Sequence, residues 1–417
     1  MKKMRNEKEM GITLITLAVT IIIMLILATV SVNAVFGDNG IIKKVKQAKE
    51  MYSNSIVKDN EEIETLLNEM AVNREGKKDE ISDLTNNWDL TKVNKVKSED
   101  NVVIPVPKGY TASTVAGEKS VSTGFVIKEG NDGSKTEGIN EFVWVPVADI
   151  SDIYDEVNKA GQLWDFGSYS SAEGRFIAKS PAEKITYSAT GYREPDVVTA
   201  ANSGSDSASG SHYDASSSNL QQAGLSSTAT ASDFKAQLQM EFDEMINSVK
   251  TYGGFYIGRY ETGNLSNSTK AVVQKNNSDI ANQTWYTMYK MCKTIKVNEN
   301  VYTGMIWGCQ WDATLRWMQT STNSEVANFP TNSEGKGNYS GKLILTGSNS
   351  SYAVNNIYDM AGNVFDWTLD VGGVNIHVFH GGYYGYLASS YPASIRDSGD
   401  AERAFKYLGC RATLYVK

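Results

Sequence analysis

The sequence predicts an α+β protein in which an apolar N-terminal helix is followed by a domain of short strands and a few helices. Three observations lead to this fold class. Residues 12–34 form a run of 23 residues without a charged side chain. From about residue 101 onward, short runs of β-branched and aromatic residues are bounded by Gly, Asn and Asp, which is typical of strands joined by turns. Apolar residues at helical spacing over 234–249 add an amphipathic helix.

Composition excludes several classes of function. The 417 residues allow two or three domains, and 40 Lys and Arg against 48 Asp and Glu give a net charge of -8. An acidic chain argues against a nucleic-acid partner. Three His residues offer little material for a histidine-ligated metal site. The three cysteines, Cys292, Cys309 and Cys410, are too few and too scattered along the sequence to indicate a zinc site or a disulfide scaffold.

The N-terminal segment predicts membrane attachment. Residues 1–11 carry a net positive charge and end in Gly11. As a helix, residues 12–34 would be about 35 Å long, which is enough to span a bilayer. An ordinary secretory signal fits less well, because the apolar run is too long and no small-x-small cleavage site closes it. A simple membrane anchor remains one interpretation.

A second interpretation comes from the order of basic leader, glycine and apolar helix. This order resembles the prepilin signal of type IV pilins and pseudopilins. The resemblance implies that a prepilin peptidase cuts between Gly11 and Ile12, and that the helix first anchors the protein and then joins a filament of pilus or pseudopilus subunits. Thr16 stands where that family usually has Glu, so the resemblance supports membrane insertion more strongly than filament assembly. We expect the protein on the extracellular face of a bacterial cell or on a pilus.

The rest of the chain is divided by its patterns. Residues 35–72 keep an apolar stripe and predict a helical stalk, and 73–100 are polar and predict a linker. Residues 203–232 hold eleven serines and predict a surface loop or disordered insert. The helix over 234–249 begins after a cap at Ser232 and ends at Gly253 and Gly254. Strands are expected at 102–106, 122–128, 141–147 and 253–263, and short helices at 284–292 and 311–318.

Three motifs near the C-terminus follow one another in a recognisable order. They are IYDMAGNVFDWT at 357–368, HGG at 380–382 and GCR at 409–411. This order resembles the formylglycine-generating enzyme, or sulfatase-modifying factor, domain, which has a YDMxGNVWEW segment, then RGG, then a closing GFR. The resemblance covers residues 101–417 and implies a C-type-lectin-like α+β domain.

The motif residues also have an interpretation from their own chemistry. We expect Gly362 to allow a turn, Trp367 to pack in the core, and Asn363 and Asp366 to hold loop backbone by hydrogen bonds. Their oxygens leave a structural calcium ion as the alternative, and no other cofactor is expected. The remaining residues of this structural motif are Gly381, Gly382 and Arg411.

The sequence departs from the enzymes at the positions that carry chemistry. The oxidase members bind copper through two cysteines shortly after the GG pair, and here Tyr386 and Tyr391 occupy those positions. Related sulfoxide synthases use three histidines to bind iron. His377 and His380 are three residues apart, and no third ligand is evident. We therefore predict that the protein is not an enzyme.

The same lectin-like scaffold resembles the variable proteins of diversity-generating retroelements, which vary in the segment between RGG and GFR. Adenine-directed mutagenesis there yields codons that cannot encode Lys, Glu, Gln, Met or Trp, and none of these occurs in residues 383–401. Tyr, Ser and Gly are also typical of adaptable binding surfaces. The predicted contact residues for a protein or glycan ligand are Tyr383, Tyr384, Tyr386, Ser389, Ser390, Tyr391, Arg396, Asp397 and Asp400.

The sequence therefore favours a membrane- or pilus-anchored protein that displays a ligand-binding domain. Two alternatives stay open. The chain could be a structural minor pseudopilin with this domain as a cap, or an oxidoreductase like the formylglycine-generating enzyme with an unrecognised site. The neighbouring genes distinguish these three functions. A diversified binding protein is expected beside a reverse transcriptase gene, a pseudopilin in a pilus assembly operon, and an oxidoreductase of this kind beside a sulfatase gene.

Overall fold

The computed structural model describes residues 81–82, 91–130, 139–185, 216–264, 270–296, 298–321, 323–373 and 375–417. The chain divides into two units, Met1–Glu80 and Ile81–Lys417, and all the described residues belong to the second. The predicted leader, apolar helix and stalk lie outside the described residues. No helix among the residues that are described is long and apolar enough to cross a bilayer. The described part mixes helices and sheets, which confirms the α+β class.

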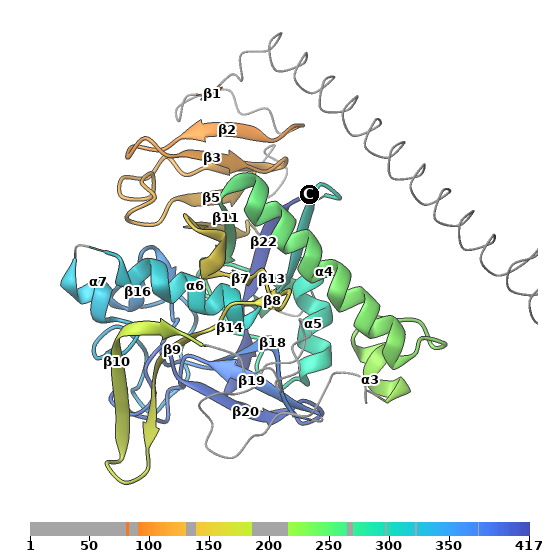
Figure 1. Ribbon diagram of the computed structural model, residues 1–417, viewed down its shortest axis with the longest axis vertical. Coiled ribbons are helices and arrows are strands. Elements are labelled where there is room, and N and C mark those ends of the chain that lie inside the picture. The colour runs from red at the N-terminus through yellow and green to blue at the C-terminus, as the bar shows by residue number, and fades with distance from the viewer. Residues whose placement is uncertain are drawn as a thin grey trace, which may run out of the picture. The chain divides into compact units, whose positions relative to one another are not determined.

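A six-stranded sheet occupies the centre of the described domain (Figure 1). Its strands are β4 (Tyr110–Ala112), β5 (Val126–Glu129), β6 (Glu141–Pro146), β11 (Gly254–Gly258), β15 (Val301–Met305) and β22 (Ala412–Val416). They run in the order β15-β22-β11-β6-β5-β4, and every neighbouring pair is antiparallel. All residues of β11 and β22 are buried, so these strands read as continuous rather than alternating apolar runs.

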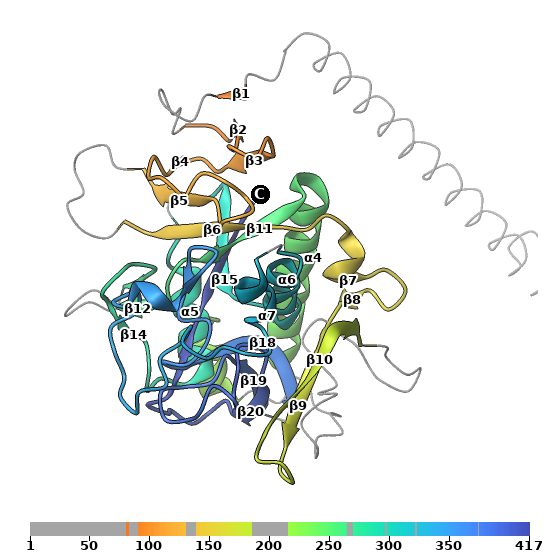
Figure 2. The ribbon, with the colours of Figure 1, turned by 90° about the vertical axis from the view of Figure 1, so that its left-hand side faces the viewer.

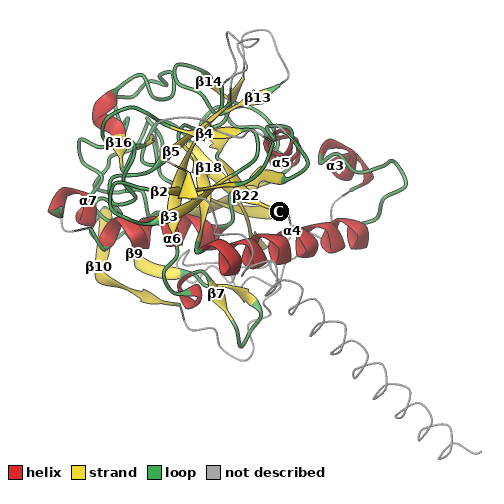
Figure 3. Ribbon diagram, turned by 90° about the horizontal axis from the view of Figure 1, so that it is seen from above, coloured by secondary structure: helices red, strands yellow, loops and turns green. Residues whose placement is uncertain are grey.

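Helices cover the strands, and Figure 3 shows the longest of them, α4, along one side of the domain. The helices are α3 (Ser217–Gln222), α4 (Ala231–Tyr252), α5 (Trp285–Lys293), α6 (Gly308–Gln319) and α7 (Ser324–Asn328), with 3₁₀ turns η1 (Ile150–Asp152) and η3 (Ser350–Tyr352). Helix α4 packs against β11 and β22, α5 against β15, and α6 against β6. The predicted apolar face of α4 is buried at all five positions, Phe234, Leu238, Phe242, Met245 and Val249.

The predicted cap of α4 was wrong by two residues. The helix begins after Thr230, whose side chain accepts a hydrogen bond from the backbone of Asp233, and the Asp233 carboxylate accepts one from the backbone of Thr230. This reciprocal capping box satisfies two otherwise unpaired N–H groups. Ser232 lies inside the helix. The end was predicted correctly, since Gly253 closes the helix with a left-handed φ of 76°.

Two segments that the sequence marked as irregular contain regular structure. Strand β2 (Asn94–Lys97) lies in the predicted linker and pairs with β3 (Val103–Val106), while β1 (Ile81–Ser82) joins its other edge. Folded structure therefore starts before residue 101, and the buried Val96 between two lysines was too short a pattern to reveal it. Helix α3 lies in the predicted serine-rich insert, where Ser216 caps it and Leu220 is buried.

A second sheet carries the C-terminal motifs and lies in the blue part of Figure 2. Its strands are β18 (Phe365–Gly373), β19 (Ile376–His380), β20 (Arg396–Asp400) and β21 (Leu408–Cys410), in the order β20-β19-β18-β21. The β18–β21 pair is parallel and the other pairs are antiparallel. Smaller sheets are formed by β7 (Tyr154–Asp155) with β8 (Ala160–Gly161), by β9 (Trp164–Ser170) with β10 (Arg175–Lys184), by β12 (Gly263–Asn264) with β13 (Ala271–Val272) and β14 (Ser278–Asp279), and by β16 (Ala353–Val354) with β17 (Ile357–Tyr358).

The motif residues hold this region together. Arg411 is fully buried and its Nε donates to the Asp366 carboxylate at 2.9 Å. The Asn363 amide donates to the buried Glu261 carboxylate at 2.6 Å and accepts from the side chain of Asn338 at 2.9 Å. Trp367 is fully buried. Gly362 has a φ of 73°, and an added Cβ would lie 2.3 Å from the carbonyl oxygen of Asn338, so only glycine fits there.

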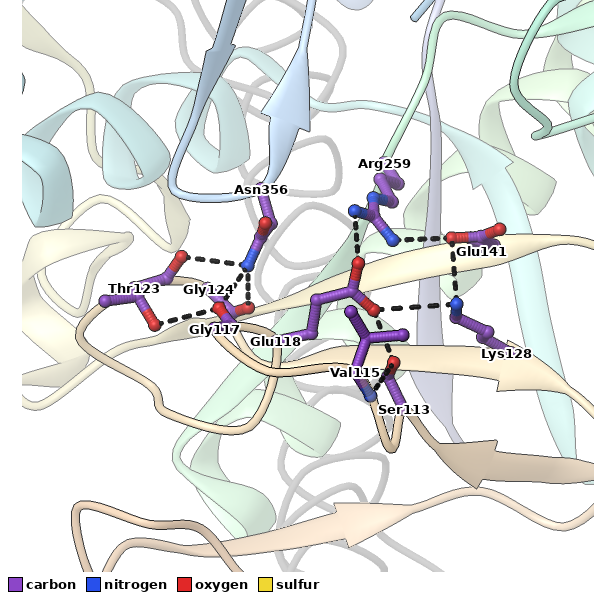
Figure 4. A network of polar contacts seen from close by, with 10 residues as sticks. All are labelled: Ser113, Val115, Gly117, Glu118, Thr123, Gly124, Lys128, Glu141, Arg259 and Asn356. Carbon is purple, nitrogen blue, oxygen red and sulfur yellow. Dashed lines mark hydrogen bonds and ion pairs between the residues drawn. The ribbon is translucent and has the colours of Figure 1, made fainter. Parts of the chain in front are cut away.

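An ion-pair network fastens the loop before β5 to the central sheet (Figure 4). The Arg259 guanidinium, just after β11, lies 2.6 Å from the Glu118 carboxylate and 2.7 Å from that of Glu141 on β6. Ser113 donates a hydrogen bond to Glu118, and Lys128 lies 3.5 Å from it. The network thereby joins two strands of the sheet to the loop.

The same loop is held at its other end by the side chain of Asn356, which donates to three carbonyl oxygens (Figure 4). The distances are 2.8 Å to Gly117, 3.1 Å to Thr123 and 2.8 Å to Gly124. Residues more than 230 positions apart in the chain are thus joined by one amide group.

The Glu118 network predicts a dependence of stability on pH. Burial raises the pKa of the Glu118 carboxyl, but hydrogen bonds from Arg259 and Ser113 and the nearby positive charges outweigh burial, so the pKa is lowered. A carboxyl with a lowered pKa in the folded state stabilises the fold above its unfolded pKa, and this stabilisation is lost as pH falls through the folded pKa. We expect Glu118→Gln to lower the free energy of unfolding by about 1–3 kcal/mol at pH 7 and by less at pH 3.

Urea unfolding at both pH values measures this difference. The matched control is Glu173→Gln, because Glu173 pairs with Arg175 at 2.6 Å but both side chains are at least half exposed. Such an exposed pair contributes about 1 kcal/mol or less. Equal losses for the Glu118 variant at pH 7 and pH 3 would contradict the assigned role of the carboxylate.

Candidate functional site

Tyrosines gather on the loop that leaves β19. Gly381 and Gly382 have φ angles of 94° and 73°, and a Cβ on Gly382 would lie 2.5 Å from the carbonyl oxygen of Tyr391. The two glycines therefore allow the chain to turn sharply and bring its later residues back toward the turn. The Tyr339 hydroxyl donates to the Tyr391 carbonyl oxygen at 2.6 Å and closes the loop.

The rings of this loop pack on one another. Tyr386 and Tyr391 stack with centroids 3.9 Å apart and planes 9° apart. Tyr383 lies edge-on to Tyr386 at 4.7 Å and to Tyr384 at 5.1 Å. Tyr407, from the loop before β21, lies 5.0 Å from Tyr383. Ring pairs of this kind stabilise by about 0.5–1.5 kcal/mol beyond burial, so the rings form an ordered surface.

Phe365, the first residue of β18, forms the floor of this surface. Its side chain is buried, and its ring centroid lies 5.5 Å from Tyr383, 6.2 Å from Tyr386 and 6.0 Å from Tyr391. The tyrosines rest on a side chain of the second sheet, which fixes their position relative to the core.

The β9–β10 hairpin supplies a further tyrosine. In Figures 1 and 2 this hairpin projects from the domain near β19 and β20. The Tyr169 ring lies 5.7 Å from Tyr391. Backbone N–H of Phe176 donates to the carbonyl oxygen of Ser389 at 2.9 Å, and the Ser390 hydroxyl donates to that of Gly174 at 3.0 Å. We name Tyr169, Tyr383, Tyr384, Tyr386, Tyr391 and Tyr407 the tyrosine patch.

The patch is partly open to solvent. Tyr386 is 38% exposed and Tyr169 is 42% exposed, and the neighbouring Leu387 is 67% exposed. Tyr383, Tyr384, Tyr391 and Tyr407 are intermediate. Clustered exposed apolar groups of this kind mark interaction sites more often than scattered ones do.

The structure brings together some of the predicted contact residues and separates others. Ser389 is exposed, and Asp397 and Asp400 are partly exposed on β20. Ser390 is buried and bonds to the hairpin. Arg396 is also buried, with its guanidinium 2.7 Å from the Asp312 carboxylate of α6. The prediction that Arg396 forms part of an exposed patch was wrong, because Asp312, 84 positions earlier, provides a buried counter-charge that the sequence does not reveal.

Sequence reasoning missed Tyr169 and Tyr407. Tyr407 lies in a stretch of mixed charged and apolar residues just before the GCR motif, and Tyr169 lies on a hairpin of ordinary strand composition. Tyr407 and Tyr169 belong to the patch because their rings contact Tyr383 and Tyr391 in the folded structure. A single sequence carries no signal for such tertiary contacts.

Burial and neighbouring groups favour the neutral form of three phenols in the patch, those of Tyr383, Tyr391 and Tyr407. Burial, followed by the neighbouring phenols, raises the pKa of Tyr383 and of Tyr391, and the Asp397 carboxylate adds to the increase at Tyr391. Burial also raises the pKa of Tyr407, with a contribution from Asp397. The patch presents ring faces and phenol hydroxyl groups beside the Asp397 carboxylate. Such a surface can stack on an apolar or sugar ring and can exchange hydrogen bonds with hydroxyl or amide groups.

His377 and His380 do not lie on the patch. His377 and His380 are fully buried on β19, where His377 stacks on Trp285 at 4.1 Å and His380 stacks on Trp311 at 5.3 Å. Burial, together with the charge of Arg396, lowers the pKa of His380 well below its ordinary value. Both rings are thus used in packing.

The donor groups in the described ranges do not assemble a metal centre. Nowhere in these ranges do three His, Cys, Asp or Glu side chains gather as they would around an ion. The side-chain oxygens of Asn363 and Asp366 accept hydrogen bonds from Asn338 and Arg411, as expected from their structural interpretation.

Comparison with known proteins gives only remote similarity. No family model matches the chain, and no curated protein matches its sequence. PvdO from Pseudomonas aeruginosa is 13% identical with a TM-score of 0.27, over 40% of this chain and 82% of PvdO. Treponema denticola variable protein 1 is 14% identical with a TM-score of 0.29, over 40% and 85% of the two chains. CarF is 14% identical with a TM-score of 0.28, over 39% and 87%. Similarities at this level carry no argument about fold or function.

Proposed function

We propose that the domain binds a protein or glycan ligand through the tyrosine patch. The observation that carries the proposal is the stacked pair Tyr386–Tyr391 on a loop that is fastened on both sides and still exposes Tyr386. Tyrosine supplies a large amphipathic contact area with few rotatable bonds, so little conformational entropy is lost on binding. The packed rings lower that cost further, because they are already ordered before the ligand arrives.

The proposal assigns no catalytic role to the patch. Tyr386 and Tyr391 stand where the resembling oxidases have their copper-binding cysteines, and a phenol cannot replace a thiolate as a ligand for copper(I). An oxidoreductase activity would therefore need a different site. A structural minor pseudopilin remains the second candidate. It rests on the leader and apolar helix of residues 1–34 and needs no exposed tyrosines.

Attachment to a membrane or pilus is the second part of the proposal. Residues 12–34 are the proposed anchor, and Gly11 and Ile12 flank the proposed cleavage site. This part concerns residues outside the described ranges and rests on the sequence. It places the ligand-binding domain outside the cell.

Diversification of the patch is the third part. Within residues 383–401, the stretch 392–396 is buried throughout, whereas 383–387 and 397–400 are exposed or intermediate. A retroelement that varied this segment could change the binding surface at the second group of positions without disturbing the core. DNA sequencing beside the gene tests this part, and we expect a near-identical repeat of the segment encoding residues 383–401 together with a reverse transcriptase gene.

Binding is tested with the full chain in detergent against arrays of immobilised glycans and surface-protein fragments. We expect at least one array component to bind, and the double variant Tyr386→Ala, Tyr391→Ala to bind it at least about 30-fold more weakly, since central aromatic contacts are worth about 2 kcal/mol or more each. Tyr252→Ala is the matched control, because Tyr252 is half-buried on α4, away from the patch. Equal binding by both variants, or unfolding of the double variant, would contradict the assignment of the patch.

A further inference from the structure

Two of the three cysteines lie in contact inside the domain. Cys292 is the residue before the last of α5, and Cys410 is the last residue of β21. They are 118 positions apart in the chain, yet their Sγ atoms lie 3.5 Å apart. Both side chains are fully buried. The sequence did not reveal this contact, because the two cysteines are far apart along the chain.

We propose that Cys292 and Cys410 form a disulfide bond when the chain folds in the presence of a thiol–disulfide oxidant. The sulfur atoms are in the reduced arrangement here and would have to approach by about 1.5 Å to reach the bond length of about 2.05 Å. Cys292 lies in the last turn of α5, two residues before the Thr294 that caps the helix, so a small adjustment of the helix end can supply this movement.

The surroundings of the pair favour a covalent bond over other uses of two thiols. The Thr262 hydroxyl lies 3.9 Å from Cys292 Sγ, and Asp366 raises the pKa of Cys410 after the larger effects of Cys292 and burial. A thiol with a raised pKa is a poor nucleophile and a poor metal ligand, since both roles need the thiolate. Burial therefore makes Cys410 a poor nucleophile in the folded domain, whereas the 3.5 Å separation of the two Sγ atoms places the pair near the distance that a disulfide requires.

The burial of both thiols sets the time at which the bond can form. An oxidant cannot reach the two thiols once the domain has folded, so the bond has to form during folding, before the thiols are buried. One cysteine thiolate attacks the disulfide of oxidised glutathione and releases one glutathione. The second cysteine thiolate then attacks the mixed disulfide and releases the other. The chain loses two electrons and two protons, and the two glutathione molecules receive them as thiols.

The bond would enclose five of the six tyrosines of the patch, all except Tyr169. Residues 383–407 lie between Cys292 and Cys410, and so does the whole of β18. Closing a loop of this length restricts the unfolded chain strongly and stabilises the folded state. Formation of this disulfide does not depend on what the patch binds, and the bond would form in a structural protein as well.

The experiment refolds the full chain from urea in detergent, once with a mixture of reduced and oxidised glutathione and once with a reducing agent. Unreacted thiols are then alkylated, and peptides are mapped by mass spectrometry without reduction. We expect a cross-linked pair of peptides containing Cys292 and Cys410 in the first sample, with a Tm several degrees above that of the second. Native reduced protein given the same oxidant should stay reduced, because its thiols are buried.

Variants separate the pair from the third cysteine. Cys309 is buried on α6 against Gly161, and Cys309→Ser should leave the cross-link and the Tm shift intact, whereas Cys292→Ser should abolish both. The peptide map of the wild-type chain needs no variant and therefore decides the matter even if a variant fails to fold. Refolded wild-type protein with both thiols alkylated, or with Cys309 in the cross-link, overturns the proposal.

Discussion

Replacement of Arg411 by alanine should lower the free energy of unfolding by about 5 kcal/mol or more. The Arg411 side chain is fully buried, and its guanidinium also donates to the carbonyl oxygens of Gly258, Tyr358 and Asp359 at 3.0 to 3.1 Å. Removing it leaves the buried carboxylate of Asp366 without its counter-charge, which costs about 3–5 kcal/mol. Each carbonyl oxygen left without a donor adds a further penalty.

Urea unfolding followed by circular dichroism measures this loss. A loss of this size is comparable with the entire stability of many domains, about 5–15 kcal/mol, so the variant is expected to be largely unfolded at 37 °C. Arg175→Ala is the control, because the Arg175 side chain is 61% exposed and an exposed ion pair contributes about 1 kcal/mol or less. A stable Arg411→Ala variant would show that the guanidinium is not needed to hold these segments.

Replacement of Arg396 by alanine should cost about 3–5 kcal/mol for a related reason. Its guanidinium is the counter-charge of the Asp312 carboxylate, which is buried on α6 and also accepts a hydrogen bond from the backbone of Trp164 at 2.8 Å. Burial raises the pKa of Asp312 even with Arg396 beside it. Without Arg396 the carboxyl would take up a proton more readily in the folded state than in the unfolded state.

That uptake of a proton gives the second variant a distinctive dependence on pH. A carboxyl with a raised folded pKa destabilises the fold more as pH rises above its unfolded pKa. The loss caused by Arg396→Ala should therefore be smaller at pH 5 than at pH 8, as measured by urea unfolding. Arg403→Ala, an exposed position in the same segment, is expected to change the free energy of unfolding by about 0.5 kcal/mol or less. If Arg396→Ala is as stable as the wild type, the Arg396 side chain is exposed to solvent, as the sequence first indicated, and does not form a buried ion pair.

Helices α4, α5 and α6 and strands β3, β5, β6 and β11 could be predicted because their signals are local. The spacing of apolar residues and the position of nearby Gly residues indicate three features within a few residues of sequence. These are the apolar face of α4, the glycine that ends this helix, and the strands β6 and β11. Strand β2 and helix α3 were missed because each has a single buried apolar residue among polar ones, Val96 in β2 and Leu220 in α3. Such short elements are stabilised by the partners they pack against rather than by their own pattern.

The candidate site could be predicted only in part. The tyrosines of residues 383–391 stood out because they are close together in the sequence, and the structure places their rings in contact. Arg396 and Ser390 lie in the same polar segment and were therefore predicted to be exposed. Both are buried, because their partners Asp312 and Gly174 come from distant parts of the chain. The contact between Cys292 and Cys410 was hidden for the same reason.

The loop of the tyrosine patch is held largely through its main chain. The carbonyl oxygen of Gly381 accepts from the backbone of Gly362, that of Tyr384 from Gly341, that of Ser389 from Phe176 and that of Tyr391 from the Tyr339 hydroxyl. Every residue type except proline offers the same main-chain groups, and every type without exception offers the carbonyl oxygen. Side chains at positions 384, 389 and 391 can therefore be exchanged while the loop keeps its course. Main-chain hydrogen bonds thus set the shape of this surface, and side chains set what it can bind. Substitutions at these positions would change the binding specificity without changing the course of the loop.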